Sequence, residues 1–164
     1  METKQRIKYR KKVFIIPYSG CKVMCVKDRI TKEWGFLSGG VKERKYESYL
    51  HAAERELCEE TSNILKYIPR NHKTFKFLTD YIPTTSLRKN IERDEIIISK
   101  YMVYMFDLNE YSDNIINDLH TKFRPNSEIE EVKVAPYSSF ENRWVVCDEF
   151  WEYYNKYYRL TTFR

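Results

Sequence analysis

The chain is poor in the residues that divide a protein into pieces. Its 164 residues include four glycines and five prolines, with no serine- or proline-rich linker and no internal repeat. We therefore expect residues 1–164 to form a single domain around one hydrophobic core, which suits this length. Apolar residues make up 42% of the chain and aromatic residues 16%, so its composition excludes a disordered protein.

Long apolar runs and paired cysteine motifs are also missing. No segment approaches the roughly 20 apolar residues of a membrane helix. The basic N-terminus, "METKQRIKYRKK", lacks the apolar run of a signal peptide. We therefore expect a cytoplasmic protein with no membrane partner. Cys21 and Cys25 have no matching second pair, so the four cysteines indicate free thiols and not a zinc site.

Charge is plentiful but unevenly distributed. The net charge is +5, yet residues 47–60 hold five glutamates and one arginine, a net of −4, which leaves +9 for the rest of the chain. A concentrated acidic segment in a basic chain suits an enzyme that holds metal cations and attracts a phosphorylated substrate. Charge alone leaves a second interpretation open, a solvated acidic helix face on a protein that is basic by chance.

The pattern of apolar residues predicts a mixed α/β fold. Strands are expected at residues 12–20, 21–29, 33–40, 73–82 and 94–108, and within 130–140, where the last strand stops at Pro136. Helices are expected at 48–61, at 111–123 with Ser112 or Asp113 as N-cap, and at 145–158 with an aromatic stripe of Val146, Phe150, Tyr154 and Tyr157 or Tyr158. The polar stretch 83–93 is expected to be a loop. Hairpin-like strand pairs among helices favour a mixed sheet with helices packed on it.

The helix at 48–61 concentrates carboxylates on one side. On a helical wheel Glu56, Glu59 and Glu60 project within an arc of about 100° and about one turn of rise. The expected buried stripe beside them consists of Leu50, Ala53, Leu57 and Ile64. Carboxylates this close destabilise a helix unless a cation lies among them. Mg²⁺ and Mn²⁺ prefer such oxygen ligands, although Arg55 and external lysines are alternative partners.

The residues around this helix resemble the signature of the Nudix hydrolase family. Glu47, seven residues, and then "RELCEE" at 55–60 match it without a gap, and Gly39, Gly40 and Glu43 match its glycine loop. Two departures follow. Six residues instead of five separate Gly40 from Glu47, an insertion within 44–46. Ser62 also replaces the last glycine, where Asn63 is expected to adopt the left-handed conformation that ends a helix.

The resemblance implies a Nudix-type α/β/α sandwich and a metal-dependent hydrolase. Such enzymes cleave a nucleoside diphosphate linked to another group, with Mg²⁺ or Mn²⁺. Carried onto this chain, the metal ligands are Glu56, Glu59, Glu60 and the carbonyl of Gly40. Arg55 pairs with Glu47 in a structural role, beside Gly39, and on the wheel it points about 100° away from Glu56. Glu59 is the expected general base.

A later acidic segment supplies a further candidate. Glu128, Glu130 and Glu131 precede or begin the strand expected at 130–140, and some family members use a glutamate from a late loop. Glu128 is therefore expected as an extra ligand or base. Solvated acids beside a strand are the alternative for all three.

The leading substrate is an mRNA 5′ cap, cleaved to release m7GDP. The basic surplus and the run from Lys4 to Lys12 suit RNA, and the chain resembles Nudix proteins of large DNA viruses, several of which are decapping enzymes. A viral protein would act in the host cytoplasm. A diphosphoinositol or dinucleoside polyphosphate, a nucleotide or sugar-nucleotide, and a binding module without catalysis remain open. The basic run is alternatively a solvated edge strand. Trp34, Trp144 and Trp151 are candidates for base stacking, with core packing favoured for Trp34 and Trp151.

Overall fold

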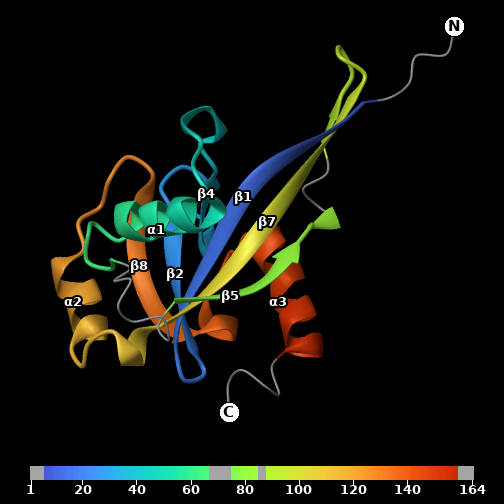
Figure 1. Cartoon of the computed structure of the whole chain (residues 1–164). Helices are drawn as coiled ribbons and strands as arrows, with labels where there is room; N and C mark the ends of the chain where they lie inside the picture. Colours follow the sequence, from blue (N-terminus) through green and yellow to red (C-terminus); the bar gives the residue numbers. More distant parts are fainter. Residues whose placement is uncertain (1–5, 67–74, 85–87, 159–164) are drawn as a thin grey trace, which may run out of the picture.

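The computed structural model describes residues 6–66, 75–84 and 88–158, and it shows a mixed sheet between helices (Figure 1). The strands are β1 (Arg6–Ser19), β2 (Lys22–Asp28), β3 (Trp34–Gly35), β4 (Leu37–Gly40), β5 (Phe75–Tyr81), β6 (Arg88–Asn90), β7 (Glu95–Asp107) and β8 (Ile129–Pro136). The helices are α1 (Tyr49–Glu60), α2 (Ile115–Lys122) and α3 (Val145–Tyr157). The order along the sheet is β3-β2-β1-β7-β5, with β4 beside β1, β6 beside β7 and β8 beside β2.

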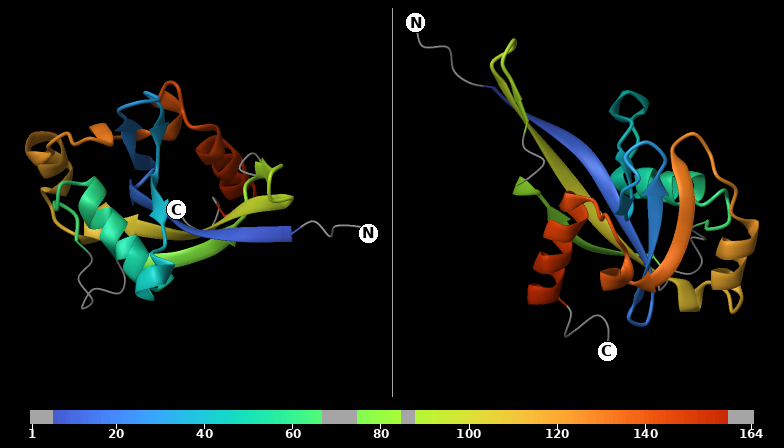
Figure 2. Two further views of the ribbon diagram at one scale, coloured as in Figure 1. Left: turned by 90° about the horizontal axis from the view of Figure 1, so that it is seen from above. Right: turned by 180° about the vertical axis from the view of Figure 1, so that it is seen from behind.

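The buried residues of strand β1 show that the sheet separates two layers of helices. Its buried residues alternate between the faces, as side chains of a strand must. Val13 and Ile15 pack in the cluster that includes Ala53 and Leu57 of α1, whereas Phe14 and Ile16 pack in the cluster of α3. Views from above and from behind place α1 and α3 on opposite faces (Figure 2). The predicted α/β/α sandwich is confirmed, and its core consists of two clusters instead of one.

Two predicted elements differ from those observed. Residues 33–40 form two strands, because the chain leaves β2 after Gly35 and joins β1 at Leu37. The predicted loop at 83–93 contains β6, which pairs through its backbone with β7 despite its polar sequence. Most of the strand predicted at 73–82 is observed as β5, and residues 73 and 74 lie outside the described ranges.

Two helices also differ in detail. Helix α2 has Asn114 as its N-cap, without a side-chain cap bond, while the Ser112 hydroxyl accepts a bond from the Asn114 N–H at 3.4 Å. In α3 the stripe of Val146, Phe150 and Tyr154 is buried as predicted, and Tyr158 packs against it, whereas Tyr157 is 60% exposed. No helix in the described ranges is long and apolar enough to cross a membrane.

Strands β1 and β7 form an arm that extends beyond the helices. They pair in parallel along their whole length, from Arg6 opposite Glu95 to Tyr18 opposite Asp107. Their first halves project past α1 and α3, with β6 alongside β7 (Figure 1). We call residues 6–12 and 95–101, with β6, the arm. The arm begins where β4 ends, since Lys12 is the residue opposite Gly40.

Candidate functional site

Helix α1 carries four of the charged residues of interest on two turns. Ser48 caps its N-terminus by accepting a hydrogen bond from the His51 N–H at 3.1 Å. Ala53 and Leu57 are fully buried as predicted, but Leu50 is 40% exposed and Ala52 is buried in its place. The buried face of the helix is therefore rotated by about 50° from the predicted stripe, towards Glu60, which is itself buried.

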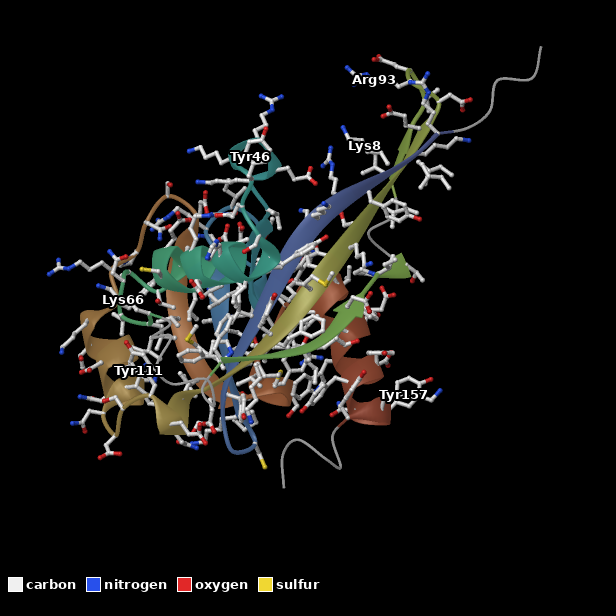
Figure 3. The ribbon with its side chains drawn as sticks, viewed as in Figure 1. Lys8, Tyr46, Lys66, Arg93, Tyr111 and Tyr157 are labelled. Carbon is white, nitrogen blue, oxygen red and sulfur yellow. The ribbon has the colours of Figure 1, made fainter. Side chains whose placement is uncertain are left out.

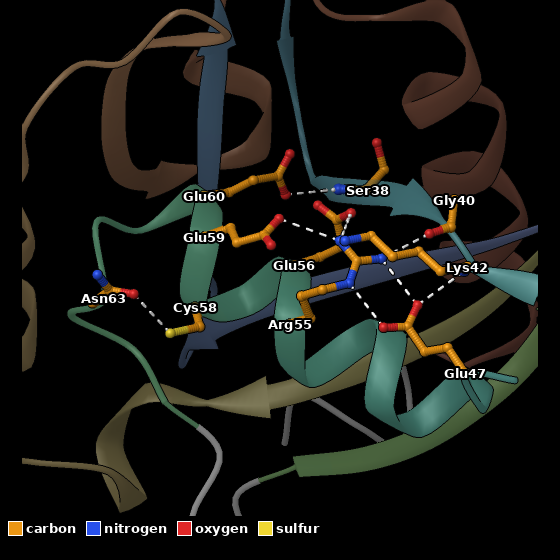
Figure 4. A network of polar contacts seen from close by, with 10 residues as sticks. All are labelled: Ser38, Gly40, Lys42, Glu47, Arg55, Glu56, Cys58, Glu59, Glu60 and Asn63. Carbon is orange, nitrogen blue, oxygen red and sulfur yellow. Dashed lines mark hydrogen bonds and ion pairs between the residues drawn. The ribbon is translucent and has the colours of Figure 1, made fainter. Parts of the chain in front are cut away.

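Arg55 joins the helix to the glycine loop. Its Nε and Nη2 donate to the two oxygens of Glu47 at 2.8 and 3.0 Å, and Nη2 also donates to the Gly40 carbonyl at 2.9 Å (Figure 4). The Lys42 N–H donates to the same carboxylate at 3.0 Å. The hydrogen bonds from Arg55 are the main cause that lowers the pKa of Glu47 to about 2, and Glu47 in turn raises the pKa of Arg55. This bidentate pair fixes the spacing between β4 and α1.

The insertion in the signature is accommodated beside this pair. Residues 43–45 form a 3₁₀ turn, and Tyr46 closes it in the left-handed conformation with φ of 56°. The Glu47 N–H then bonds to the Lys42 carbonyl at 3.2 Å, which closes the loop below the turn. The extra residue thus bulges outward, and Glu47 still reaches Arg55.

Arg55 also contacts the carboxylates on its own helix. Its Nη1 lies 2.8 Å from Glu56 and 3.2 Å from Glu59. The wheel prediction that Arg55 points away from Glu56 is wrong, because the long side chain curls back along the helix. Glu59 is the outermost of the acids, with a side chain 55% exposed, whereas the Glu56 side chain is 12% exposed.

Glu60 is the most buried acid of the helix, with 8% of its surface exposed. One of its oxygens accepts a hydrogen bond from the Ser38 N–H of β4 at 3.1 Å. Burial is the largest cause that raises its pKa well above the ordinary value, and the charges of Glu56, Glu128 and Glu59 add to it. Burial likewise raises the pKa of Glu56, although Arg55 opposes the shift. A positive charge at this place would relieve both groups.

The Glu56 side chain lies so close to the backbone of Gly39 that a side chain at position 39 would overlap it. A β-carbon built on Gly39 would overlap the Glu56 carboxylate, while Gly40 has open space in the same position. Only glycine therefore lets the backbone of β4 pass directly against this carboxylate.

Glu128 is brought to the site by a turn before β8. The Asn126 side chain accepts from the Glu128 and Ile129 N–H groups at 2.8 Å, and the Glu128 carbonyl accepts from the Arg29 N–H at 2.9 Å. The charge of Glu128 adds to the raised pKa of Glu56 and of Glu60, which places Glu128 in the neighbourhood of both carboxyl groups. Glu130 instead pairs with Lys32 at 2.6 Å, and Glu131 is exposed.

Ser62, which replaces the last glycine of the signature, lies just after the end of α1. Ser62 and Asn63 both adopt left-handed conformations, with φ of 55° and 64°. The predicted left-handed Asn63 is confirmed, and Ser62 carries a strain of about 1–2 kcal/mol that glycine would avoid. In exchange the Ser62 hydroxyl donates to the Arg124 carbonyl at 2.9 Å and accepts from the Arg124 N–H at 3.1 Å. These two bonds tie the end of α1 to the segment that leads to Glu128.

This arrangement of glycine loop, ion pair and helix carboxylates can be compared with known proteins. The sequence profile described as the NUDIX domain matches residues 8–158, which is most of the chain. The chain belongs to the Nudix family. A comparison with curated proteins finds no match.

Solved structures agree with the Nudix fold. The NUDIX domain of Shewanella oneidensis NrtR, complexed with ADP ribose, matches with a TM-score of 0.57 at 17% identity, over 98% of this chain and 91% of that one. A mutant of the Bacillus subtilis pyrophosphohydrolase BsRppH matches with a TM-score of 0.56 at 18% identity, over 90% and 79%. The MutT protein of Methanosarcina mazei Go1 matches with a TM-score of 0.60 at 12% identity, over 94% and 97%.

The Nudix site has the donor atoms for a divalent cation. Nudix hydrolases generally use Mg²⁺ or Mn²⁺. As the side chains stand, no three His, Cys, Asp or Glu residues of the described ranges converge closely enough to hold a metal. Glu56 and Glu59 turn to Arg55, and Glu60 turns to Ser38. Their oxygen chemistry and the raised pKa of Glu56 and Glu60 nevertheless fit a hard cation, which would replace Arg55 as the partner of Glu56 and Glu59.

A cavity adjoins these carboxylates that the sequence did not reveal. It has a volume of about 240 Å³ and extends from Glu60 and Ser38 on one side to Trp144 on the other. Its remaining lining residues are Val26, Asp28, Thr31, Glu33, Gly35, Phe36 and Ile129. Trp144 is the predicted stacking candidate, and it lies at this cavity. Trp34 and Trp151 pack against the α3 cluster as predicted, and Trp144 packs against the same cluster while also lining the cavity. The cavity depends on four segments far apart in the chain, so no local pattern could have indicated it.

Proposed function

We propose that the protein hydrolyses a phosphoric anhydride bond in a nucleoside-diphosphate-linked substrate, with Mg²⁺ or Mn²⁺. The observation that carries this proposal is that Glu56 and Glu60 lie against Ser38 and Gly39 of β4, where burial raises the pKa of both carboxyl groups and the charges of Glu59 and Glu128 add to the shift. In this role Glu56, Glu59, Glu60 and the Gly40 carbonyl hold the cation. When bound, the cation neutralises the diphosphate and acidifies a water molecule.

The chain's own residues divide the remaining work. Arg55 and Glu47 hold the Gly40 carbonyl at a fixed distance from the helix, and Gly39 lets Glu56 lie against the strand. Glu59 is the candidate general base, because it is the most exposed acid of the helix and its contact with Arg55, at 3.2 Å, is longer than the 2.8 Å contact of Glu56. Glu128, whose charge adds to the raised pKa of Glu56 and Glu60, is the second candidate.

The leading substrate is the 5′ cap of an RNA. The cavity beside Glu60 has room for about one nucleobase, and Trp144 offers a ring on which a base can stack. Asp28 and Glu33 give the cavity an acidic lining, which favours a base with a positive charge, such as 7-methylguanine. The released product would be m7GDP, and the site of action would be the cytoplasm.

Small nucleoside diphosphates are the second candidate. The observation in their favour is that the NrtR domain, which matches nearly the whole chain, was solved with ADP ribose. Nucleotide sugars, dinucleoside polyphosphates and diphosphoinositol phosphates belong in the same panel of substrates. A binding module without catalysis would bind one of them and release it unchanged.

The test is a substrate panel with Mg²⁺ and with Mn²⁺, followed over time for product. The panel holds cap-labelled RNA, free cap analogue, ADP-ribose, a nucleoside triphosphate, a dinucleoside polyphosphate and a diphosphoinositol phosphate. We expect cap-labelled RNA to be cleaved fastest, and Glu59→Gln to lower turnover by at least ~10². Glu131→Gln, an exposed acid outside the cluster, is the matched control. Cleavage of small nucleotides with untouched capped RNA would rule out decapping, and binding without product would rule out the enzyme.

A further inference from the structure

The positive charge of the protein is concentrated in two segments that lie side by side. Residues 6–12 of β1 and the loop of residues 41–46 contain eight basic residues and one acidic residue, a net charge of +7. Since the whole chain carries +5, the other 151 residues carry −2. We call these two segments the basic strip. Most of the positive charge outside the acidic helix therefore lies in the basic strip.

Three contacts join the two segments at the root of the arm. Lys12 lies opposite Gly40 in the sheet, the Val41 N–H donates to the Lys11 carbonyl at 3.0 Å, and the Lys11 ammonium lies 3.3 Å from Glu43. Gly40 is also the residue that Arg55 contacts in the Nudix site. The basic strip therefore starts at the glycine loop and continues from it along the arm.

The cations of the arm are arranged in a row. Arg6, Lys8 and Arg10 are alternate residues of one strand, so they share a face and follow one another at about 6.6 Å. All three are exposed, and the described part of the chain supplies no ion-pair partner for them. Within the described ranges no strand pairs with residues 6–11 on the second edge of β1, because β4 pairs only with residues 12–15. A row of unpaired cations along an open edge suits a linear chain of anions.

The loop adds an aromatic ring to the strip. Tyr46 is 96% exposed, at the tip of the loop above α1, while Lys8 lies on the arm (Figure 3). The left-handed backbone of Tyr46 costs about 1–2 kcal/mol. Because its ring is exposed, packing against the described residues does not offset this cost. An exposed ring among Lys42, Arg44 and Lys45 is the combination with which proteins bind single-stranded nucleic acid, since bases stack on the ring while cations contact phosphates.

We propose that the basic strip binds the single-stranded polynucleotide that continues from the scissile diphosphate. A base stacks on Tyr46, and successive phosphates lie along Arg10, Lys8 and Arg6. The proposal rests on the proposed function insofar as the strand belongs to the substrate. It gives the enzyme a preference for a nucleotide at the end of an RNA over the same nucleotide free in solution.

The geometry favours a nucleic acid over two other occupants. A second copy of the chain would place two rows of like charge against each other along the open edge. A membrane surface needs cations and apolar side chains on one plane, but Ile7 and Tyr9 alternate with the basic row and so project from the opposite face of the arm.

Binding can be measured without turnover. The probe is a 5′-fluorescein-labelled single-stranded RNA of about 20 nucleotides without a cap, and the readout is anisotropy in EDTA over a range of salt concentrations. For the variant Arg6→Gln/Lys8→Gln/Arg10→Gln we expect at least ~10-fold weaker binding and a salt slope flatter by about 2, as three lost phosphate contacts predict. The matched control, Lys66→Gln/Arg124→Gln/Lys156→Gln, removes the same charge from exposed positions elsewhere and should bind within about twofold of wild type.

A second variant separates stacking from charge. Tyr46→Ala should weaken RNA binding by about 5-fold or more, with no change in binding to inorganic polyphosphate, which has no bases. Equal losses in the arm variant and the matched control would overturn the proposal in favour of a net-charge effect. An unchanged RNA affinity in the arm variant would show that the arm does not bind RNA. Binding to phosphatidylserine vesicles without binding to RNA would overturn it in favour of a membrane.

Hydrolysis of free cap analogue or ADP-ribose distinguishes this failure from failure of the proposed function. The arm variant should cleave such small substrates like wild type and lose only its advantage on capped RNA, as a raised KM. Cleavage of small substrates with no RNA binding refutes the strip alone. Strip-dependent RNA binding with no hydrolysis of any substrate refutes the proposed function alone.

Discussion

The pair of Glu47 and Arg55 permits a quantitative prediction about stability. Glu47→Gln keeps the size of the side chain and removes the charge that Arg55 contacts at 2.8 and 3.0 Å. The fall of the Glu47 pKa from 4.5 to about 2 corresponds to about 3 kcal/mol of interaction. Both side chains are largely buried, 13% and 19% exposed, but they lie at the surface of the loop. Solvent screening reduces the figure, so we expect a loss of about 2 kcal/mol at pH 7.

The same pair has a defined dependence on pH. Because folding lowers the pKa of Glu47, its contribution is complete above the unfolded pKa near 4.5 and disappears as the pH falls towards 2. The difference between wild type and Glu47→Gln should therefore shrink by about 40% between pH 7 and pH 3.5. Urea denaturation of both proteins at the two pH values measures it.

A neighbouring residue provides the control. Glu43 lies in the same loop and pairs with Lys11 at 3.3 Å, but its side chain is 58% exposed. Glu43→Gln should change stability by less than about 0.5 kcal/mol. If Glu47→Gln is as stable as Glu43→Gln, or if its deficit is the same at both pH values, then the ion pair does not stabilise the loop and the reasoning fails.

Three further predictions concern the site. Glu60→Gln should stabilise the metal-free protein at pH 7, because the raised pKa shows that the charged form is disfavoured there, and it should abolish the rise in Tm that Mg²⁺ gives wild type; thermal unfolding with and without Mg²⁺ measures both effects. Gly39→Ala should lower turnover by at least ~10² with retained fold, since the β-carbon displaces Glu56; normal turnover would contradict the assigned closeness. Ser62→Gly should change stability by less than about 1 kcal/mol, because relief of a left-handed backbone offsets the two lost bonds to Arg124; a gain above about 2 kcal/mol in urea denaturation would show that those bonds contribute nothing.

Much of the fold could be predicted from local patterns. The helix with its carboxylates, the hairpin of β1 and β2 and the aromatic stripe of α3 each depend on residues close in sequence, whose period shows in the chain itself. The predictions were wrong where tertiary structure overrides composition. Strand β6 is polar but bonds to β7 through its backbone. Leu50 has an apolar side chain but lies on the exposed side of α1.

The sequence by itself determined the family, the acids of α1 and the partner of Arg55, because the signature places them within 22 residues and one helix sets their directions. Only the tertiary structure separates the acids of residues 128–131, since the charge of Glu128 acts on Glu56 and Glu60 whereas Glu130 pairs with Lys32. The tertiary structure also places Glu60 and Trp144 at one cavity, and it brings the basic residues of β1 beside Gly40. These features require β1, β4, β8 and α3 to meet, and contacts between distant segments leave no periodic trace in the chain.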